Sequence, residues 1–204
     1  MPFVRRSSYA FRTLSLAAAA ALTAGACAAP MTTTATAAGE VAPSATMFSE
    51  PSVAATSSAS NQYEIQTSQL AVERAQSPAV KDFARRMIDH HTRLEQQQAA
   101  LLQQKGLAPM DNAHSAQLKK NLPPTLAMLR QHQGAAFDGM YLVDQIGQHK
   151  NTLLTIDTSL LPSTRDPQMQ AMLRDQVRPA VVQHLDEAMR LHHQMLAPAA
   201  GGMR

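Results

Sequence analysis

Three histidines and one glutamate are the residues of this sequence whose types and spacing suggest chemistry. The segment FARRMIDHHTRLE, residues 83–95, contains the adjacent pair His90 and His91, and His149 and His184 stand in QIGQHKNTL and VVQHL. Neutral imidazole rings are common ligands of zinc, iron and copper, and a carboxylate can complete such a set. Whether these side chains can meet depends on the elements that carry them.

Long helices are predicted to carry these residues. The chain is rich in Ala, Gln, Leu and Met, and it lacks the Val-, Ile- and Thr-rich runs that favour strands. Ser77-Pro78 and Asp166-Pro167 each read as an N-cap followed by a first-turn proline. The predicted long helices span residues 51–76, 78–105, 135–161 and 167–196. A shorter helix is expected before Pro123-Pro124 and another after it, and Pro179 is expected to bend the last long helix.

Helical periodicity predicts which histidine of the pair faces inward. At 100° per residue, His91 falls in the centre of an apolar face, and His90 lies at its edge. The residues of that face are Val80, Ala84, Met87, Leu94 and Leu102. By the same test, His149 and His184 are central on the apolar faces of their helices. The first helix has no histidine, and Glu64, among small side chains, is its inward polar candidate.

The four candidates, Glu64 and the three histidines, also lie at comparable distances along their helices from the nearest helix–helix turn. Glu64 and His91 are nearly symmetric about the turn at 76–78, and His149 and His184 about the turn at 162–166. Each lies roughly 20 Å from its own turn at about 1.5 Å of helix rise per residue. The four would meet at one level if the two turns lie at opposite ends. The pattern predicts an all-α fold, a ferritin-like four-helix bundle with one long crossover connection.

Four segments of the sequence resemble motifs of a bacterial family known as domain of unknown function 4142. They are YEIQTSQLA, FARRMIDHHT, FDGMYLVDQIGQH and VVQHL. The resemblance implies a ferritin-like bundle, export from the cytoplasm, functional positions at Glu64, His91, His149 and His184, and no settled activity. Two positions that are Asp in the family are His90 and Gln148 here, so a carboxylate next to each histidine is missing.

Several functions remain open for this set. Three imidazoles and a carboxylate would suit one zinc, iron or copper ion. Glu95 and Glu187, one turn beyond His91 and His184, would support the ligands or join them, with His90 and Gln148 as further neighbours. We favour a non-catalytic binding or structural bundle. The alternatives are a metal-dependent redox enzyme and a metal-free buried polar layer that fixes helix register.

Ferroxidase chemistry of the di-iron type is disfavoured by the spacing. That site requires Glu-x-x-His on two helices. The residues three positions before the candidate histidines are apolar, namely Ile88, Ile146 and Val181.

The charge distribution argues against nucleic acid as a partner. The net charge is +3, but three of the 18 basic residues, Arg5, Arg6 and Arg12, precede every acidic residue. The remaining 15 basic residues balance the 15 acidic ones. A neutral body offers no electrostatic footprint for phosphate.

The N-terminal segment has the features of a secretory signal, predicted over residues 1–27. A basic region precedes the apolar stretch LSLAAAAALTA, and LTAGAC resembles a lipobox ending at Cys27, the only cysteine. We expect acylation of Cys27 and a membrane anchor; ordinary signal cleavage is the alternative. A flexible linker is expected over residues 28–49, the bundle over 50–197 and a disordered tail over 198–204. The expected location is the periplasm or the outer membrane.

Overall fold

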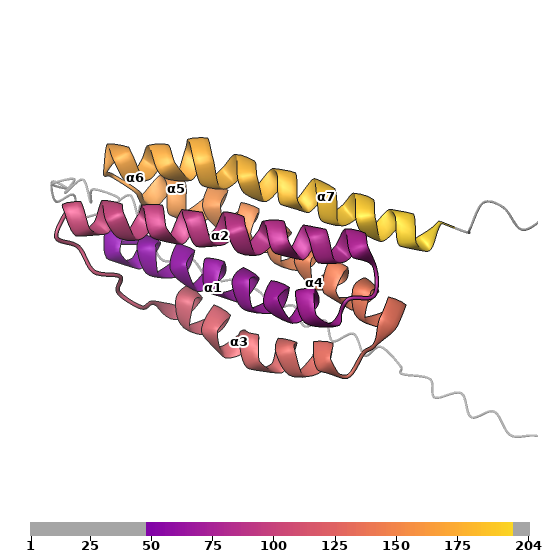
Figure 1. Ribbon diagram of the computed structural model, residues 1–204. Coiled ribbons are helices and arrows are strands. Elements are labelled where there is room, and N and C mark those ends of the chain that lie inside the picture. The colour runs from indigo at the N-terminus through magenta and orange to yellow at the C-terminus, as the bar shows by residue number, and fades with distance from the viewer. Residues whose placement is uncertain (1–47, 198–204) are drawn as a thin grey trace, which may run out of the picture. The chain divides into compact units, whose positions relative to one another are not determined.

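The computed structural model describes residues 48–197, and this part of the chain is helical without any strand (Figure 1). The prediction of an all-α fold is confirmed there. The longer helices are α1 (Glu50–Arg74), α2 (Pro78–Gln104), α3 (Ala113–Arg130), α4 (Gly134–Thr155) and α7 (Arg178–Leu196). The shorter elements are η1 (Ile156–Leu160), α5 (Leu161–Ser163), α6 (Pro167–Met172) and η2 (Leu173–Val177), where η denotes a π-helix.

Some of the sequence predictions lie outside the described residues. These are the signal peptide at 1–27 with Cys27, the linker as far as residue 47, and the tail at 198–204. Among the helices that the structure does describe, none has the length and apolar content needed to cross a membrane.

The helix starts follow the capping signals in the sequence. Asp166 is the N-cap of α6, and its carboxylate accepts hydrogen bonds from the backbone N–H groups of Gln168 and Met169. Ser77 is the N-cap residue of α2, although its hydroxyl makes no capping hydrogen bond. Gly106, just after α2, has a φ of 62°, a left-handed conformation that favours glycine at a helix end.

The predicted break at Pro123-Pro124 is wrong, because α3 runs through both prolines. A proline inside a helix leaves the carbonyl four residues earlier without its donor. Here the carbonyls affected belong to Lys119 and Lys120, both at exposed positions where water can bind them. The cost of the two missing donors is therefore lower than in a buried helix.

Pro179 is accommodated by a change of helix type. Helical structure continues from Pro167 to Leu196, as the periodicity predicts, but residues 173–177 form the π-helix η2. The Arg178 N–H donates to the carbonyl of Leu173, five residues earlier. The wider turn directly precedes the proline, which has no N–H to donate. The π-helix η1 stands in the same relation to Pro162.

The helices pack in pairs, α1 with α2 and α4 with α7, and α3 lies along α1 (Figure 1). Two sets of contacts locate the turns. The Asp138 carboxylate of α4 accepts from the Gln76 and Ser77 N–H groups of the α1–α2 turn. Glu50, at the start of α1, accepts from the Arg165 and Asp166 N–H groups of the α5–α6 turn. The α1–α2 turn and the turn before α6 therefore lie at opposite ends of α1.

The core consists of two apolar clusters. The first, here called the aromatic cluster, comprises Leu70, Ala71, Ala75, Val80, Phe83, Ala84, Met87, Leu129, Phe137, Tyr141, Leu142, Ala188 and Leu191. The second, here called the aliphatic cluster, comprises Val53, Ala54, Leu94, Leu102, Ile156, Leu160, Met169, Leu173, Val177 and Val181. Along α2, His91 lies between Met87 of the first cluster and Leu94 of the second. The core is thus divided at the level of the histidines.

Candidate functional site

His91, His149 and His184 meet between the two apolar clusters. All three are buried, with exposed fractions of 3%, 1% and 5%. Their ring centroids are 6.0 Å apart for His91–His149, 5.2 Å for His91–His184 and 5.4 Å for His149–His184. One potential ligand atom from each residue lies within 4.8 Å of the others. Helices α2, α4 and α7 each supply one ring.

Helical periodicity accounts for the inward position of His91. Met87 and Leu94, one turn on either side, are buried in the core, and Asp89 is exposed. His90 is half-buried, as its position at the edge of the face predicts. Its Nδ1 lies 2.8 Å from Nε2 of His184, so His90 contacts the cluster from the side.

Glu64 is buried beside the histidines, with an exposed fraction of 1%. Its Oε1 lies 3.6 Å from Nδ1 of His149, and neither of its carboxyl oxygens has a hydrogen-bond partner among the described residues. Burial, and secondarily the charge of Asp144, raises the pKa of Glu64 well above its usual value. Burial therefore favours the protonated, neutral form of the Glu64 carboxyl.

Each histidine has one ring nitrogen held by a partner. Nδ1 of His91 lies 3.0 Å from the Asn61 Oδ1, and Nδ1 of His149 lies 2.8 Å from the Gln145 backbone oxygen. A carbonyl oxygen only accepts, so both of these nitrogens carry the proton. The opposite nitrogens, Nε2 of His91 and of His149, then present lone pairs. Both are buried, and neither has a hydrogen-bond partner in the described part of the chain.

His184 is arranged differently, because its partner is another histidine. Its Nε2 bonds His90, and its Nδ1 is buried without a hydrogen-bond partner from residues 48–197. When the His184 Nε2–H donates to Nδ1 of His90, Nδ1 of His184 carries a lone pair. Three imidazole nitrogens, one from each buried histidine, can thus each offer a lone pair.

Burial keeps these rings neutral. It lowers the pKa of His149 to about 4 and that of His184 to about 3, the latter with a further contribution from the neighbouring His149. Burial and the surrounding histidines also lower the pKa of His91 well below its usual value. Because a metal ion binds the neutral imidazole, no proton has to leave these rings at pH 7.

The residues predicted to support the ligands have different surroundings. The Glu95 carboxylate accepts from the Asn61 amide, at 3.0 Å, and from the Ser58 hydroxyl, so Glu95 acts on His91 through Asn61. Glu187 is bonded by Arg86, and its Oε1 also lies 3.5 Å from Nη2 of Arg190. Glu187 therefore belongs to an ion-pair group with two arginines.

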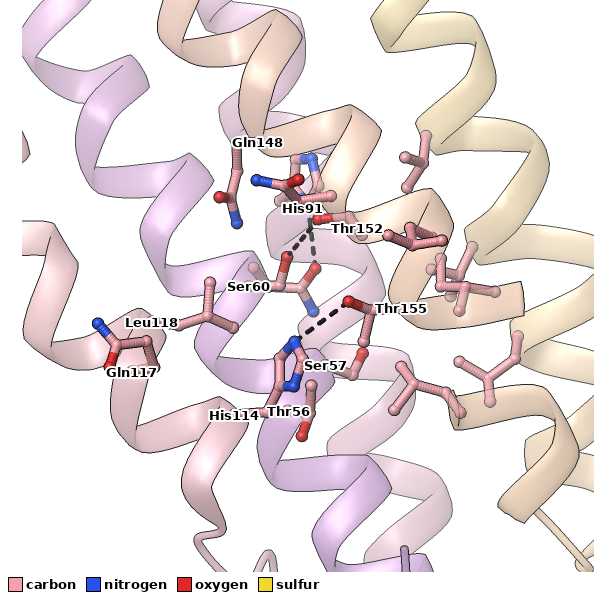
Figure 2. Close-up of a pocket in the computed structure, with 18 of the residues that line it drawn as sticks. Thr56, Ser57, Ser60, His91, His114, Gln117, Leu118, Gln148, Thr152 and Thr155 are labelled. Carbon is pink, nitrogen blue, oxygen red and sulfur yellow. Dashed lines mark hydrogen bonds between the residues drawn. The ribbon is translucent and has the colours of Figure 1, made fainter. Parts of the chain in front are cut away.

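A pocket of about 540 Å³ reaches the site from outside (Figure 2). His91 is one of its lining residues, so the pocket extends from the surface to the histidine cluster. Gln148, the fourth predicted neighbour, is half-buried in the pocket wall. Figure 2 shows Gln148 and Thr152 near His91, with Ser57 and His114 further along the pocket. Hydrogen bonds of Ser60 with Thr152, at 3.3 Å, and of His114 with Thr155, at 3.2 Å, cross it.

Sequence reasoning missed Asn61 and the polar groups around Glu64. Asn61 lies three residues before Glu64 and shares its helix face, a signal that was available. Gln145, four residues before His149, donates its side-chain amide to Thr67 at 3.3 Å. Tyr63 donates to Asp144 at 2.8 Å, and Tyr141 bonds Ser68 at 2.8 Å. The pairings between helices carry no signal in a single sequence.

The fold and the site together define an all-helical protein with a buried cluster of three histidines beside an accessible pocket. A family model described as "Domain of unknown function (DUF4142)" matches residues 31–191 of the 204. The chain belongs to this family, as its sequence motifs predict. The match begins within the segment predicted to be a linker. Comparison with curated proteins and with solved structures finds no significant match.

Proposed function

We propose that the protein holds one zinc, iron or copper ion through His91, His149 and His184, and serves as a binding protein. The observation that carries the proposal is the set of three buried ring nitrogens without hydrogen-bond partners in the described residues. Leaving such groups unpaired costs about 1–3 kcal/mol each, and a bound cation would remove this cost. Imidazole nitrogen is a preferred ligand of these metals.

The nitrogens have to move closer together in order to share one ion. In a tetrahedral site with metal–nitrogen bonds of about 2.1 Å, neighbouring ligand nitrogens lie about 3.4 Å apart. One ring nitrogen of each histidine lies within 4.8 Å of those of the other two. Metal binding would therefore shorten the widest of these distances by up to about 1.4 Å, through rotations of the side chains. Glu64, next to His149, would neutralise part of the ion's charge once it loses its proton.

The metal-free polar layer explains the site less well. In that interpretation, the glutamate and the histidines hydrogen-bond one another. The Glu64 oxygens and three of the histidine nitrogens have no such partner within residues 48–197. Mutual hydrogen bonding therefore does not account for the groups that most need it.

Metal analysis tests the proposal. The purified protein, stripped by chelator and reloaded separately with zinc, iron(II) or copper(II), is expected to retain one equivalent of at least one metal. The double variant His91→Ala, His149→Ala should lose it. The control variant His192→Ala, His193→Ala changes two histidines near the end of α7 and should retain it. Failure of the native protein to retain any of the three metals would show the proposal to be wrong.

The pocket favours a second candidate, a metal-dependent redox enzyme. Three protein ligands leave a coordination position open, and the pocket that reaches His91 gives a small molecule access to it. Cobalt(II) substitution tests this candidate, because neutral imidazole shifts the visible absorption of cobalt when it enters an open position. A spectrum unchanged by imidazole would favour a closed site used for holding the ion.

We further propose that the helices form a ferritin-like four-helix bundle, with α3 in the crossover. The paired hairpins, the long connection between α2 and α4, and the turns at opposite ends support this assignment. A crystal structure of residues 48–197 tests it. Helix pairings other than α1–α2 and α4–α7 would contradict it.

Export to the cell envelope completes the proposal. Its support is the sequence of residues 1–27, with Arg5, Arg6 and Arg12 before an apolar stretch and Cys27 at its end. Acylation at Cys27 would anchor the protein in the periplasm or at the outer membrane. Labelling with a radioactive fatty acid, compared with Cys27→Ala, tests the anchor. Absence of label in the native protein would indicate ordinary secretion.

A further inference from the structure

The pocket beside the histidines has the size and lining of a binding site for a small organic molecule. Its volume of about 540 Å³ falls within the roughly 300–1,000 Å³ typical of small-molecule sites. Helices α1, α3 and α4 supply most of its wall, and Leu118 projects into it from α3 (Figure 2). One end reaches His91.

The lining divides into a polar and an apolar part. Hydroxyl and carboxamide side chains of α1 and α4 form the polar part, with Ser57, Ser60, Asn61, Gln148, Asn151 and Thr152. Members of the aliphatic cluster form the apolar part, with Ile156, Leu160, Leu173, Val177 and Val181. A ligand that fills the pocket would therefore have both hydrogen-bonding and apolar groups.

The lining also selects against charge. Among the described residues that line the pocket, none is Asp, Glu, Lys or Arg, and His91 and His114 are the ionisable side chains. An ion entering such a pocket would lose its water without gaining an opposite charge, which is costly. An uncharged ligand does not have this desolvation cost, and the hydroxyl and amide groups of the lining can form hydrogen bonds with its polar atoms.

We propose that this pocket binds a neutral, partly apolar small molecule, with its polar groups bonded to the side chains of α1 and α4 and its apolar groups among the side chains of the aliphatic cluster. The inference goes beyond metal binding and does not depend on it, since the lining described here is that of the protein alone.

A matched pair of fluorescent probes tests the proposal on the full chain. N-phenyl-1-naphthylamine is uncharged, and 8-anilinonaphthalene-1-sulfonate has the same aromatic framework with a sulfonate added. Both emit more strongly in apolar surroundings. The neutral probe is expected to bind the chelator-treated protein saturably with one site per chain. The sulfonate should bind at least tenfold more weakly.

Two leucine variants of α3 locate the bound probe. Leu118 lines the pocket, and Leu122 lies one turn further along, outside it; both are half-buried. Leu118→Trp should weaken binding of the neutral probe at least tenfold, because the indole occupies pocket volume. Leu122→Trp should change it less than twofold. Thr155→Trp on α4 provides a second blocking variant if circular dichroism shows Leu118→Trp to be misfolded.

The outcomes separate this proposal from the metal site. Absence of saturable binding, equal binding of the two probes, or equal effects of the two leucine variants would each overturn it. Neutral-probe binding in a protein that retains no metal would support the pocket and reject the metal site. Retention of metal without probe binding would do the reverse.

Discussion

The aromatic and aliphatic clusters lie on either side of the histidines. Of these two clusters, the aliphatic cluster is the one that contributes residues to the pocket that reaches His91. In the aromatic cluster, Phe83, Phe137 and Tyr141 are fully buried, and the ring centroids of Phe83 and Tyr141 are 6.2 Å apart. In the aliphatic cluster, five members form part of the pocket wall. One end of the core is closed by large rings, and the other leaves space for a ligand.

The difference shows how one helical core can combine rigidity with access. Close packing at the aromatic end fixes the helices that carry the histidines. At the aliphatic end, the π-helices η1 and η2 interrupt regular α-helical packing and supply Ile156, Leu160, Leu173 and Val177 to the pocket. π-Helical turns are frequently found at functional sites.

Paired leucine truncations should show the largest contrast between the two ends. Leu142→Ala, in the aromatic cluster, is expected to lower the free energy of unfolding by about 4 kcal/mol, since it opens a cavity in close-packed surroundings. Leu160→Ala should cost about 2 kcal/mol, because Leu160 already borders open space and loses fewer contacts. Urea denaturation of both variants provides the measurement. Equal costs would remove the contrast in packing.

Metal binding should stabilise the layer between the clusters. If zinc is the ion retained, a free zinc concentration one hundred times the dissociation constant should raise the free energy of unfolding by about 2.7 kcal/mol. Leu160→Ala should keep this gain, because it leaves the histidines in place, and His149→Ala should lose it. Thermal denaturation with and without zinc measures both. A gain that persists in His149→Ala would place the ion elsewhere.

Acid should destabilise the metal-free protein through the same layer. The pKa of His149 falls from 6.5 to about 4 on folding, so the unfolded chain takes up the proton more readily. The stability from neutral His149 is complete above pH 6.5 and is lost as the pH falls through 4. His149→Gln should show a shallower decline over this range in urea denaturation at a series of pH values. Parallel pH profiles would contradict this assignment.

The smallest contrast concerns hydrogen bonds at the two ends. Tyr141→Phe removes the buried bond to Ser68 and leaves that hydroxyl unpaired, at an expected cost of about 1–2 kcal/mol. Thr155→Val removes the exposed bond to His114 at the pocket and should change the stability by less than about 0.5 kcal/mol. Chemical denaturation would measure both. A larger effect for Thr155→Val than for Tyr141→Phe would show that the exposed hydrogen bond stabilises the protein more than the buried one.

The sequence was sufficient to predict features that depend on one helix at a time. Ser77-Pro78 and Asp166-Pro167 mark helix starts by local chemistry, and a 3.6-residue period is enough to turn His91 inward and Asp89 outward. The continuity of α3 through Pro123-Pro124 was not predicted, because it depends on water reaching the Lys119 and Lys120 carbonyls. That exposure is a property of how α3 sits on α1.

The surroundings of the histidines were harder to predict for the same reason. The ring of His91 is oriented by Asn61 of α1, and the ring of His184 by His90 of α2. These pairings depend on the relative rotation of two helices, which periodicity fixes only to about one residue. Glu187 is a further example, since its ion pair with Arg86 joins α7 to α2 and could not be predicted from spacing along one helix.

The π-helix η2 gives the segment before His184 one residue more than a regular α-helix would hold. It accommodates five residues where an α-helix would place about four, between the N-cap at Asp166 and His184. Deleting one of its residues would restore α-helical bonding and leave the residues that follow close to their present orientation. Deleting a residue from the α-helical part between Arg178 and His184 would instead rotate His184 by about 100° and turn it away from the other two rings. Single deletions should therefore be tolerated within residues 173–177 and poorly tolerated within residues 178–183.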